Sequence, residues 1–103
     1  MSVLHINNNN FESEVLRSDK PVLLDFFASW CGPCKMLSPV IDAFAEEYPQ
    51  YKVCKINVEE EQELAQKYGV MSIPTLVVVK DGDVASKAVG YRRKEQLLEL
   101  LEG

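Results

Sequence analysis

The fold of this chain is decided by one stretch, Val22-Leu23-Leu24-Asp25-Phe26-Phe27-Ala28-Ser29-Trp30-Cys31-Gly32-Pro33-Cys34. Residues 22–28 are apolar at every position except Asp25, so a strand formed here would bury both of its faces. Strands of that kind occur in parallel sheets that are covered by helices on both sides. We therefore predict a central, buried strand that ends beside two closely spaced thiols.

A helix is predicted directly after Cys34, where apolar residues recur at intervals of three and four until Pro49. Pro39 lies inside this helix and is expected to kink it, because proline lacks the backbone donor and collides with the preceding turn. The apolar positions that define the helix are Leu37, Val40, Ile41, Phe44, Ala45 and Tyr48.

The rest of the chain divides into further strands and helices. The predicted strands are residues 3–6, 52–58, 75–80 and 84–89, and the predicted helices are residues 11–18, 60–68 and 94–102. Asn9 or Asn10 is expected to cap the helix at 11–18, and Gly69 to close the helix at 60–68. Asp81-Gly82 is typical of a type I′ turn, which joins two antiparallel strands into a hairpin.

This order of elements predicts an α/β fold. Strands that alternate with helices form a three-layer sandwich with right-handed crossover connections, and the last two strands add an antiparallel hairpin at the edge. A chain of 103 residues suits one hydrophobic core. Because the sequence contains no internal repeat and no linker, we expect residues 1–103 to form a single domain.

The composition excludes several classes of function. A net charge of -5 leaves no basic surface for a phosphate backbone. No stretch approaches the ~20 apolar residues of a membrane-spanning helix, and the first ten residues lack the pattern of a secretory signal. Three cysteines are too few for a disulfide-stapled secreted domain. We expect a cytoplasmic protein that binds neither nucleic acid nor membranes.

Cys31 and Cys34 form a C-x-x-C pair at a transition from strand to helix, which is typical of redox chemistry. Residues three apart in a first helical turn lie on one side, close enough for a disulfide. The partial positive charge of the helix N-terminus favours a thiolate at Cys31. Cys31, at the exposed lip, is the expected nucleophile, and Cys34, one turn deeper, resolves the mixed disulfide. Gly32 admits a partner backbone, and Pro33 suits a first turn.

A structural zinc site is the alternative interpretation of this cysteine pair, and it requires two further ligands. Only Cys54 and His5 remain, with no second closely spaced pair, so the redox interpretation is favoured. Cys54 lies between Val53 and Lys55 in a predicted strand and is expected to be a small buried core residue rather than a regulatory thiol.

The sequence resembles the thioredoxin family over essentially its whole length, from Phe11 to Leu101. The residues that carry the resemblance, in family order and spacing, are Asp25-Phe26, Trp30-Cys31-Gly32-Pro33-Cys34-Lys35, Pro39, Lys55, Ile73-Pro74-Thr75 and Gly90. Two positions differ from the common family pattern. Phe27 replaces a frequent tryptophan, and Tyr91-Arg92-Arg93 follows Gly90 where smaller, less basic residues are usual. We favour a helix-cap role for the two arginines over recognition of acidic partners.

The resemblance implies a central mixed five-stranded sheet and a cis peptide bond between Ile73 and Pro74. It also implies an apolar docking surface for extended substrates, formed by Trp30, Gly32, Pro33, Ile73, Pro74 and Gly90. Asp25, buried beneath Cys34, would accept the proton of that thiol, with Lys55 nearby. Burial is expected to raise the pKa of Asp25, and Lys55 to lower it partly again.

The function that the resemblance implies is protein-disulfide reduction by a dithiol carrier, with the Cys31-Cys34 pair in place of any cofactor. Its partners would be client proteins that contain disulfides and a thioredoxin reductase, dependent on either NADPH or ferredoxin, and we expect a monomer. Two alternatives stay open: a disulfide oxidant or isomerase on the same fold, and a binding or scaffold subunit with idle thiols. A neutral Gly-Pro between the cysteines favours the reductant.

Overall fold

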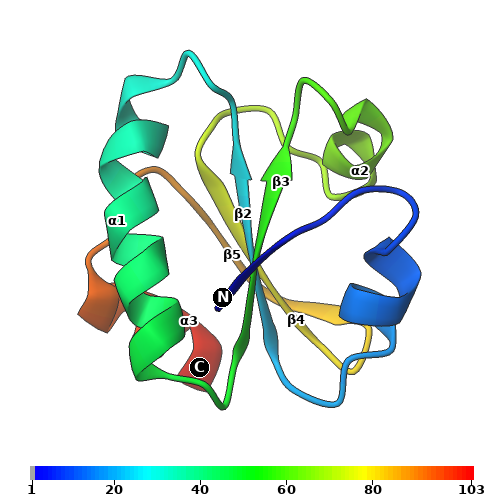
Figure 1. The fold of residues 1–103 in the computed structure, drawn as a ribbon, viewed down its shortest axis with the longest axis vertical. Helices are drawn as coiled ribbons and strands as arrows, with labels where there is room; N and C mark the ends of the chain where they lie inside the picture. The colour runs from blue at the N-terminus through cyan, green and yellow to red at the C-terminus, as the bar shows by residue number, and fades with distance from the viewer. Residues whose placement is uncertain (1) are drawn as a thin grey trace.

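The computed structural model describes residues 2–103 (Figure 1). The chain alternates between strands and helices, as predicted from its apolar spacing. Its strands are β1 (Val3–His5), β2 (Val22–Phe27), β3 (Lys52–Asn57), β4 (Thr75–Lys80) and β5 (Asp83–Val89). Its helices are α1 (Gly32–Glu47), α2 (Gln62–Lys67) and α3 (Lys94–Glu102), with a short π-helical segment η1 (Glu12–Leu16) between β1 and β2.

The five strands form one mixed sheet in the order β1-β3-β2-β4-β5. β3 runs parallel to both β1 and β2, whereas β4 is antiparallel to β2 and to β5. The register places Asp25 of β2 beside Lys55 of β3 and beside Leu76 of β4. The predicted mixed sheet, its central buried strand and its edge hairpin are therefore confirmed.

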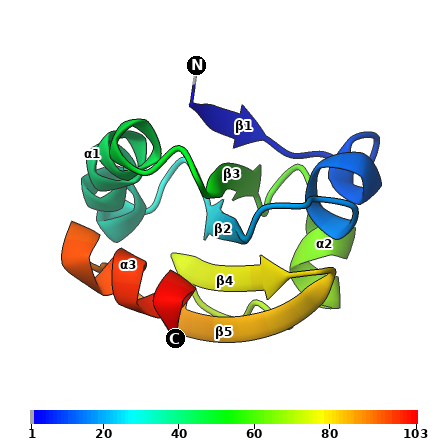
Figure 2. The same cartoon turned by 90° about the horizontal axis from the view of Figure 1, so that it is seen from below.

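The sheet separates two layers of helices, as Figure 2 shows: α1 and α3 cover one face, and α2 and η1 cover the other. Because side chains alternate along a strand, each face has its own core. The α1-face core consists of Leu23, Leu37, Ile41, Phe44, Ala45, Val53, Leu76, Val78, Leu97 and Leu101. The α2-face core consists of Ile6, Phe11, Val15, Val22, Leu24, Phe26, Cys54, Ile56, Leu64, Val77 and Val79.

The hairpin turn has the predicted chemistry. Asp81 and Gly82 have φ angles of 52° and 83°, the pair of positive values that a type I′ turn requires. Gly69 follows α2 with a φ of 63°, as expected for a glycine that closes a helix.

The first helical segment differs from its prediction. A helix was expected at residues 11–18 with an asparagine cap, but η1 is shorter and has no side-chain cap. The Asn10 side chain instead accepts from the Asn7 N–H at 2.8 Å and donates to the His5 carbonyl at 3.0 Å. The asparagines therefore satisfy the turn after β1, and none caps the helix. No helix within residues 2–103 is long and apolar enough to cross a membrane.

Candidate redox site

Cys31 and Cys34 form a disulfide at the start of α1, with their Cα atoms 5.2 Å apart. Cys31 is the N-cap residue of the helix, and its Sγ accepts the Cys34 N–H at 3.1 Å. That N–H is one of the backbone donors that a helix N-terminus leaves without a helical partner. The same donor and the helix dipole would stabilise negative charge on Cys31 Sγ after reduction.

The disulfide is more enclosed than the sequence predicted. Cys31 and Cys34 are each only 4% exposed, so the expectation that Cys31 stands at an exposed lip is wrong for this state. The loop before β4 covers the disulfide, and its Ile73 carbonyl oxygen lies 3.8 Å from Cys31 Sγ. Ala28, buried at the end of β2, packs against both cysteines.

The loop over the disulfide has the cis bond that the resemblance implies, between Ile73 and Pro74. Two hydrogen bonds hold the loop in place, one from the chain after β5 and one within the loop. The Gly90 N–H donates to the Pro74 carbonyl at 2.8 Å, and the Thr75 hydroxyl donates to the Ser72 carbonyl. Gly90 has a φ of 98°, which only glycine adopts without strain.

The predicted docking surface is exposed only in part. Trp30, Gly32 and Pro33 are exposed and Ile73 and Gly90 are half-buried, but Pro74 is buried. Because Pro74 is buried, its ring does not belong to the outer surface.

Two exposed apolar side chains, Met36 and Met71, were not predicted from the sequence, and Tyr91 was noted only as a departure from the family pattern. Met71 is 96% exposed, Met36 66% and Tyr91 41%. Their places in the chain contained the signal, since Met71 precedes Ile73 by two residues, Met36 follows Cys34 by two and Tyr91 follows Gly90.

Asp25 is buried as predicted, with 1% of its surface exposed. It shares the strand face of Leu23, which belongs to the α1-face core, and it therefore points toward α1. Among the described residues, Asp25 Oδ1 is the one buried side-chain oxygen or nitrogen without a hydrogen-bond partner. Burial raises the pKa of Asp25 to about 7, while Lys55 lowers it and Asp42 raises it.

Lys55 lies beside Asp25 in the sheet, but its ammonium group contacts other residues. Lys55 Nζ donates to the Ser38 hydroxyl and lies 3.9 Å from Asp42 Oδ1, both on α1. It also lies 5.9 Å from the centroid of the Phe27 ring. Ser38 and Asp42 were not predicted, although they follow Cys34 at intervals of four, the spacing of one helix face.

One cavity of about 150 Å³ joins these groups. Asp25 and Cys34 both line this cavity, which opens to solvent at Ser29 and Lys35. The residues that line it are Asp25, Phe27, Ala28, Ser29, Cys34, Lys35, Ser38 and Lys55.

The remaining predicted candidates lie elsewhere. Cys54 is buried in the α2-face core, as expected, where burial raises the pKa of its thiol to about 12. His5, at the end of β1, pairs with Lys55 of β3. Neither Cys54 nor His5, the two candidate zinc ligands, therefore lies beside the Cys31-Cys34 pair. Within residues 2–103, no group of three or more potential metal ligands occurs.

Arg92 and Arg93, the two arginines after Gly90, form hydrogen bonds with residues close to them in sequence. Arg92 Nη1 donates to the carbonyls of Val89 and Tyr91, both at 3.0 Å. The Arg93 N–H donates to Gln96 Oε1 at 2.9 Å at the start of α3. Arg93 is thus the N-cap residue of α3 but makes no side-chain cap, and Arg92 contacts the chain before the helix, so the helix-cap interpretation holds for Arg93 by position only.

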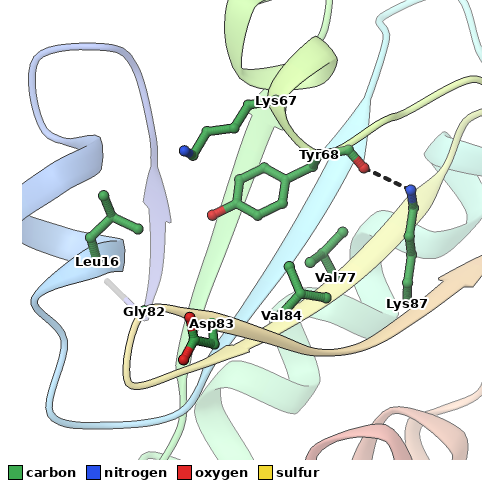
Figure 3. A pocket seen from close by; sticks show the side chains of 8 residues that line it. All are labelled: Leu16, Lys67, Tyr68, Val77, Gly82, Asp83, Val84 and Lys87. Carbon is green, nitrogen blue, oxygen red and sulfur yellow. Dashed lines mark hydrogen bonds between the residues drawn. The ribbon is translucent and has the colours of Figure 1, made fainter.

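A second hollow, of about 390 Å³, lies on the α2 side of the molecule (Figure 3). The Tyr68 hydroxyl points into it, and Leu16, Val77 and Val84 surround it. Lys87 closes one side, where its Nζ donates to the Tyr68 carbonyl at 2.7 Å and to the Gly69 carbonyl at 3.1 Å. Because β5 begins here, at the hairpin, this hollow lies toward the opposite end of the sheet from the disulfide.

Comparison with known proteins identifies relatives over nearly the whole chain. The family model described as Thioredoxin matches residues 2–103. The thioredoxin of Haemophilus influenzae is 49% identical over 100 residues, which cover 96% of this chain and 94% of the relative. The thioredoxin of Bacillus subtilis is 48% identical over 102 residues (98% and 96%), and that of Pseudomonas aeruginosa 46% over 101 residues (97% and 94%).

Proposed function

This chain belongs to the thioredoxin family and reduces protein disulfides, and we propose that Cys31 attacks the substrate while Cys34 resolves the mixed disulfide. Thioredoxins use a redox-active cysteine pair rather than a prosthetic group, and a thioredoxin reductase recycles them. The observation that carries the division of roles is the N-cap position of Cys31, whose Sγ already accepts a backbone N–H.

The first step is attack by the Cys31 thiolate on one sulfur of the client disulfide. A mixed disulfide forms and the other client sulfur leaves as a thiolate. The helix N-terminus supports this step, because the Cys34 N–H and the helix dipole stabilise the negative charge on Cys31 Sγ. Trp30, Gly32 and Pro33 supply an exposed apolar surface, and the half-buried Ile73 backbone offers pairing groups to an extended client segment.

In the second step, Cys34 attacks Cys31 Sγ and releases the second client thiolate, which regenerates the Cys31-Cys34 disulfide. Two electrons have then passed to the client. Cys34 must first lose its proton, and we assign Asp25 as the acceptor. Burial raises the pKa of Asp25 to about 7, so the carboxyl exchanges protons readily near neutral pH. Lys55 is the cation that limits this rise in pKa.

A trapping experiment tests these roles. Cys34→Ser keeps the attacking thiol but cannot resolve, so mixed disulfides with client proteins should accumulate and be released by dithiothreitol. Cys31→Ser is the matched control and should trap nothing, because Cys34 lies inside the first turn of α1 and lacks the N-cap position of Cys31. Equal trapping by both variants would overturn the assignment.

We also propose that the protein acts as a monomer in the cytoplasm. The edge strand β5 carries Asp83 and Lys87, charges that oppose pairing between sheet edges. A carrier that must return to its dithiol form requires a compartment where a reductase supplies electrons. Sedimentation of the purified protein and thiol-trapping in fractionated cells test the two statements separately. Comparing turnover with NADPH-dependent and ferredoxin-dependent reductases would identify the donor.

A further inference from the structure

Lys55 has two possible partners, and the structure shows which one it uses. The register places Lys55 next to Asp25 on adjacent parallel strands. Its Nζ nevertheless donates to the Ser38 hydroxyl and lies 3.9 Å from Asp42 Oδ1. Asp25 Oδ1 has no hydrogen-bond partner among the described residues. Although both side chains lie on the α1 face of the sheet, the ammonium group contacts two α1 residues and not Asp25, and one oxygen of the buried carboxyl is left without a donor.

The helix side of this arrangement is a polar stripe. Cys34, Ser38 and Asp42 follow one another at intervals of four on α1, so they lie on one face of the helix. Cys34 is buried, Ser38 is half-buried, and the Asp42 side chain is 62% exposed. The stripe thus leads from the disulfide toward solvent, and Lys55, whose side chain is 13% exposed, meets its outer two members.

We propose that Ser38 and Asp42 are positioning residues that hold the Lys55 ammonium group away from Asp25, so that the buried carboxyl stays able to accept the Cys34 proton. This proposal rests on the role assigned to Asp25 above. If Lys55 were free to turn inward, it would bond the unpartnered oxygen and stabilise the carboxylate. A stabilised carboxylate is a weaker base and would take the proton less readily.

The other charged groups around Asp25 come from each neighbouring element. β4 contributes only the apolar Leu76 at this register position. α1 contributes Lys35 and Asp42, while β1 contributes His5, which shares an outer hollow with Asp42, Glu46 and Lys55. Glu59 contacts Ser29 at the rim of the cavity.

Ser38 is uncharged, and this separates the proposal from a simple charge effect. Asp42→Asn removes a negative charge that itself raises the pKa of Asp25, so its effect mixes two causes. Ser38→Ala changes no charge but releases Lys55. Because Ser38 also lines the cavity with Asp25, a Lys55→Met background separates the release of Lys55 from a change in the lining. Alanine is also a better helix former than serine, so this variant should fold.

The decisive measurement is the titration of the Asp25 carboxyl by carbon-detected NMR in the oxidised protein. We expect Ser38→Ala to lower the Asp25 pKa by roughly 0.5 to 1 and Ser38→Ala with Asp42→Asn to lower it further. Glu46→Gln removes the same charge one turn along α1 and should change the pKa less than Asp42→Asn. In a Lys55→Met background, Ser38→Ala should no longer change the Asp25 pKa.

The pH profile of insulin reduction provides a second measurement. Its acidic limb should shift to lower pH in the same variants. An Asp25 pKa that is unchanged in Ser38→Ala, or that shifts equally without Lys55, would overturn the proposal. Failure of the proposed base role gives a different result: Asp25→Asn would reduce insulin at the parental rate, while the NMR titration would still report where Lys55 points.

Discussion

Replacing Asp25 with asparagine should make the folded protein more stable at neutral pH. The pKa of Asp25 is raised from 3.8 to about 7, because burial penalises its charged form more than Lys55 compensates. Each tenfold change in acidity corresponds to about 1.4 kcal/mol, so at pH 7 the carboxyl costs the native state about 4 kcal/mol relative to a neutral group of the same shape. Burying the asparagine amide costs about 1 to 3 kcal/mol of this. The expected net gain is therefore about 1 to 3 kcal/mol.

The sign and the pH range follow from linkage. Below pH 3.8 the carboxyl is neutral in both the folded and the unfolded chain, so the substitution gains nothing from charge. As the pH rises from 3.8 to about 7, the unfolded chain loses this proton first and the parent loses stability relative to Asp25→Asn. Above about 7 the difference between the two proteins becomes constant.

Urea unfolding of the oxidised parent and variant, measured at several pH values from 4 to 8, checks this prediction. The difference in unfolding free energy should increase by about 1.4 kcal/mol for each pH unit in the middle of that range. The variant should also reduce insulin more slowly than the parent. A stability difference that is independent of pH would refute the reasoning, because it would mean that Asp25 titrates normally in the folded protein.

Two further predictions concern residues outside the redox site. Cys54→Ala should cost about 1 kcal/mol of stability, since it removes one buried sulfur atom, and should keep insulin reduction within about twofold of the parent; a large loss of activity would contradict the core role of Cys54. Lys87→Met should lower the unfolding free energy by about 0.5 to 1 kcal/mol at low salt, because Lys87 bonds the carbonyls of Tyr68 and Gly69 at the end of α2. Figure 3 shows the first of these bonds. Lys80→Met removes the same charge from the neighbouring strand, and an equal effect there would exclude the helix-end contact as the cause.

The sequence predicted the order of the elements because periodicity is a strong local signal. The uninterrupted apolar run at 22–28 identified the central strand, and Asp81-Gly82 identified the hairpin and its turn type. Burial of Asp25 was predictable for the same reason, since exposing it would also expose the large side chains next to it. Structural features that depend on residues close in sequence could therefore be predicted from the sequence.

Features set by distant contacts could not be derived in this way. The burial of Cys31 and Pro74 depends on how the loop before β4 packs over the disulfide. The Ser38 contact joins residues that are 17 apart, so it depends on the register of β3 against α1. Asn10 had two possible partners, the helix N-terminus or the turn at Asn7, and local sequence does not decide between them.

The division of the interior into two cores has a consequence for engineering. The redox groups lie on the α1 side of the sheet, with Asp25 in line with Leu23, whereas Cys54 and Phe26 belong to the α2-face core. Substitutions on opposite faces of the sheet share few contacts, so their effects on the free energy of unfolding should be close to additive. The α2-face core and the hollow around Tyr68 therefore offer space for stabilising substitutions that leave electron transfer unchanged, whereas repacking around α1 would alter stability and redox chemistry together.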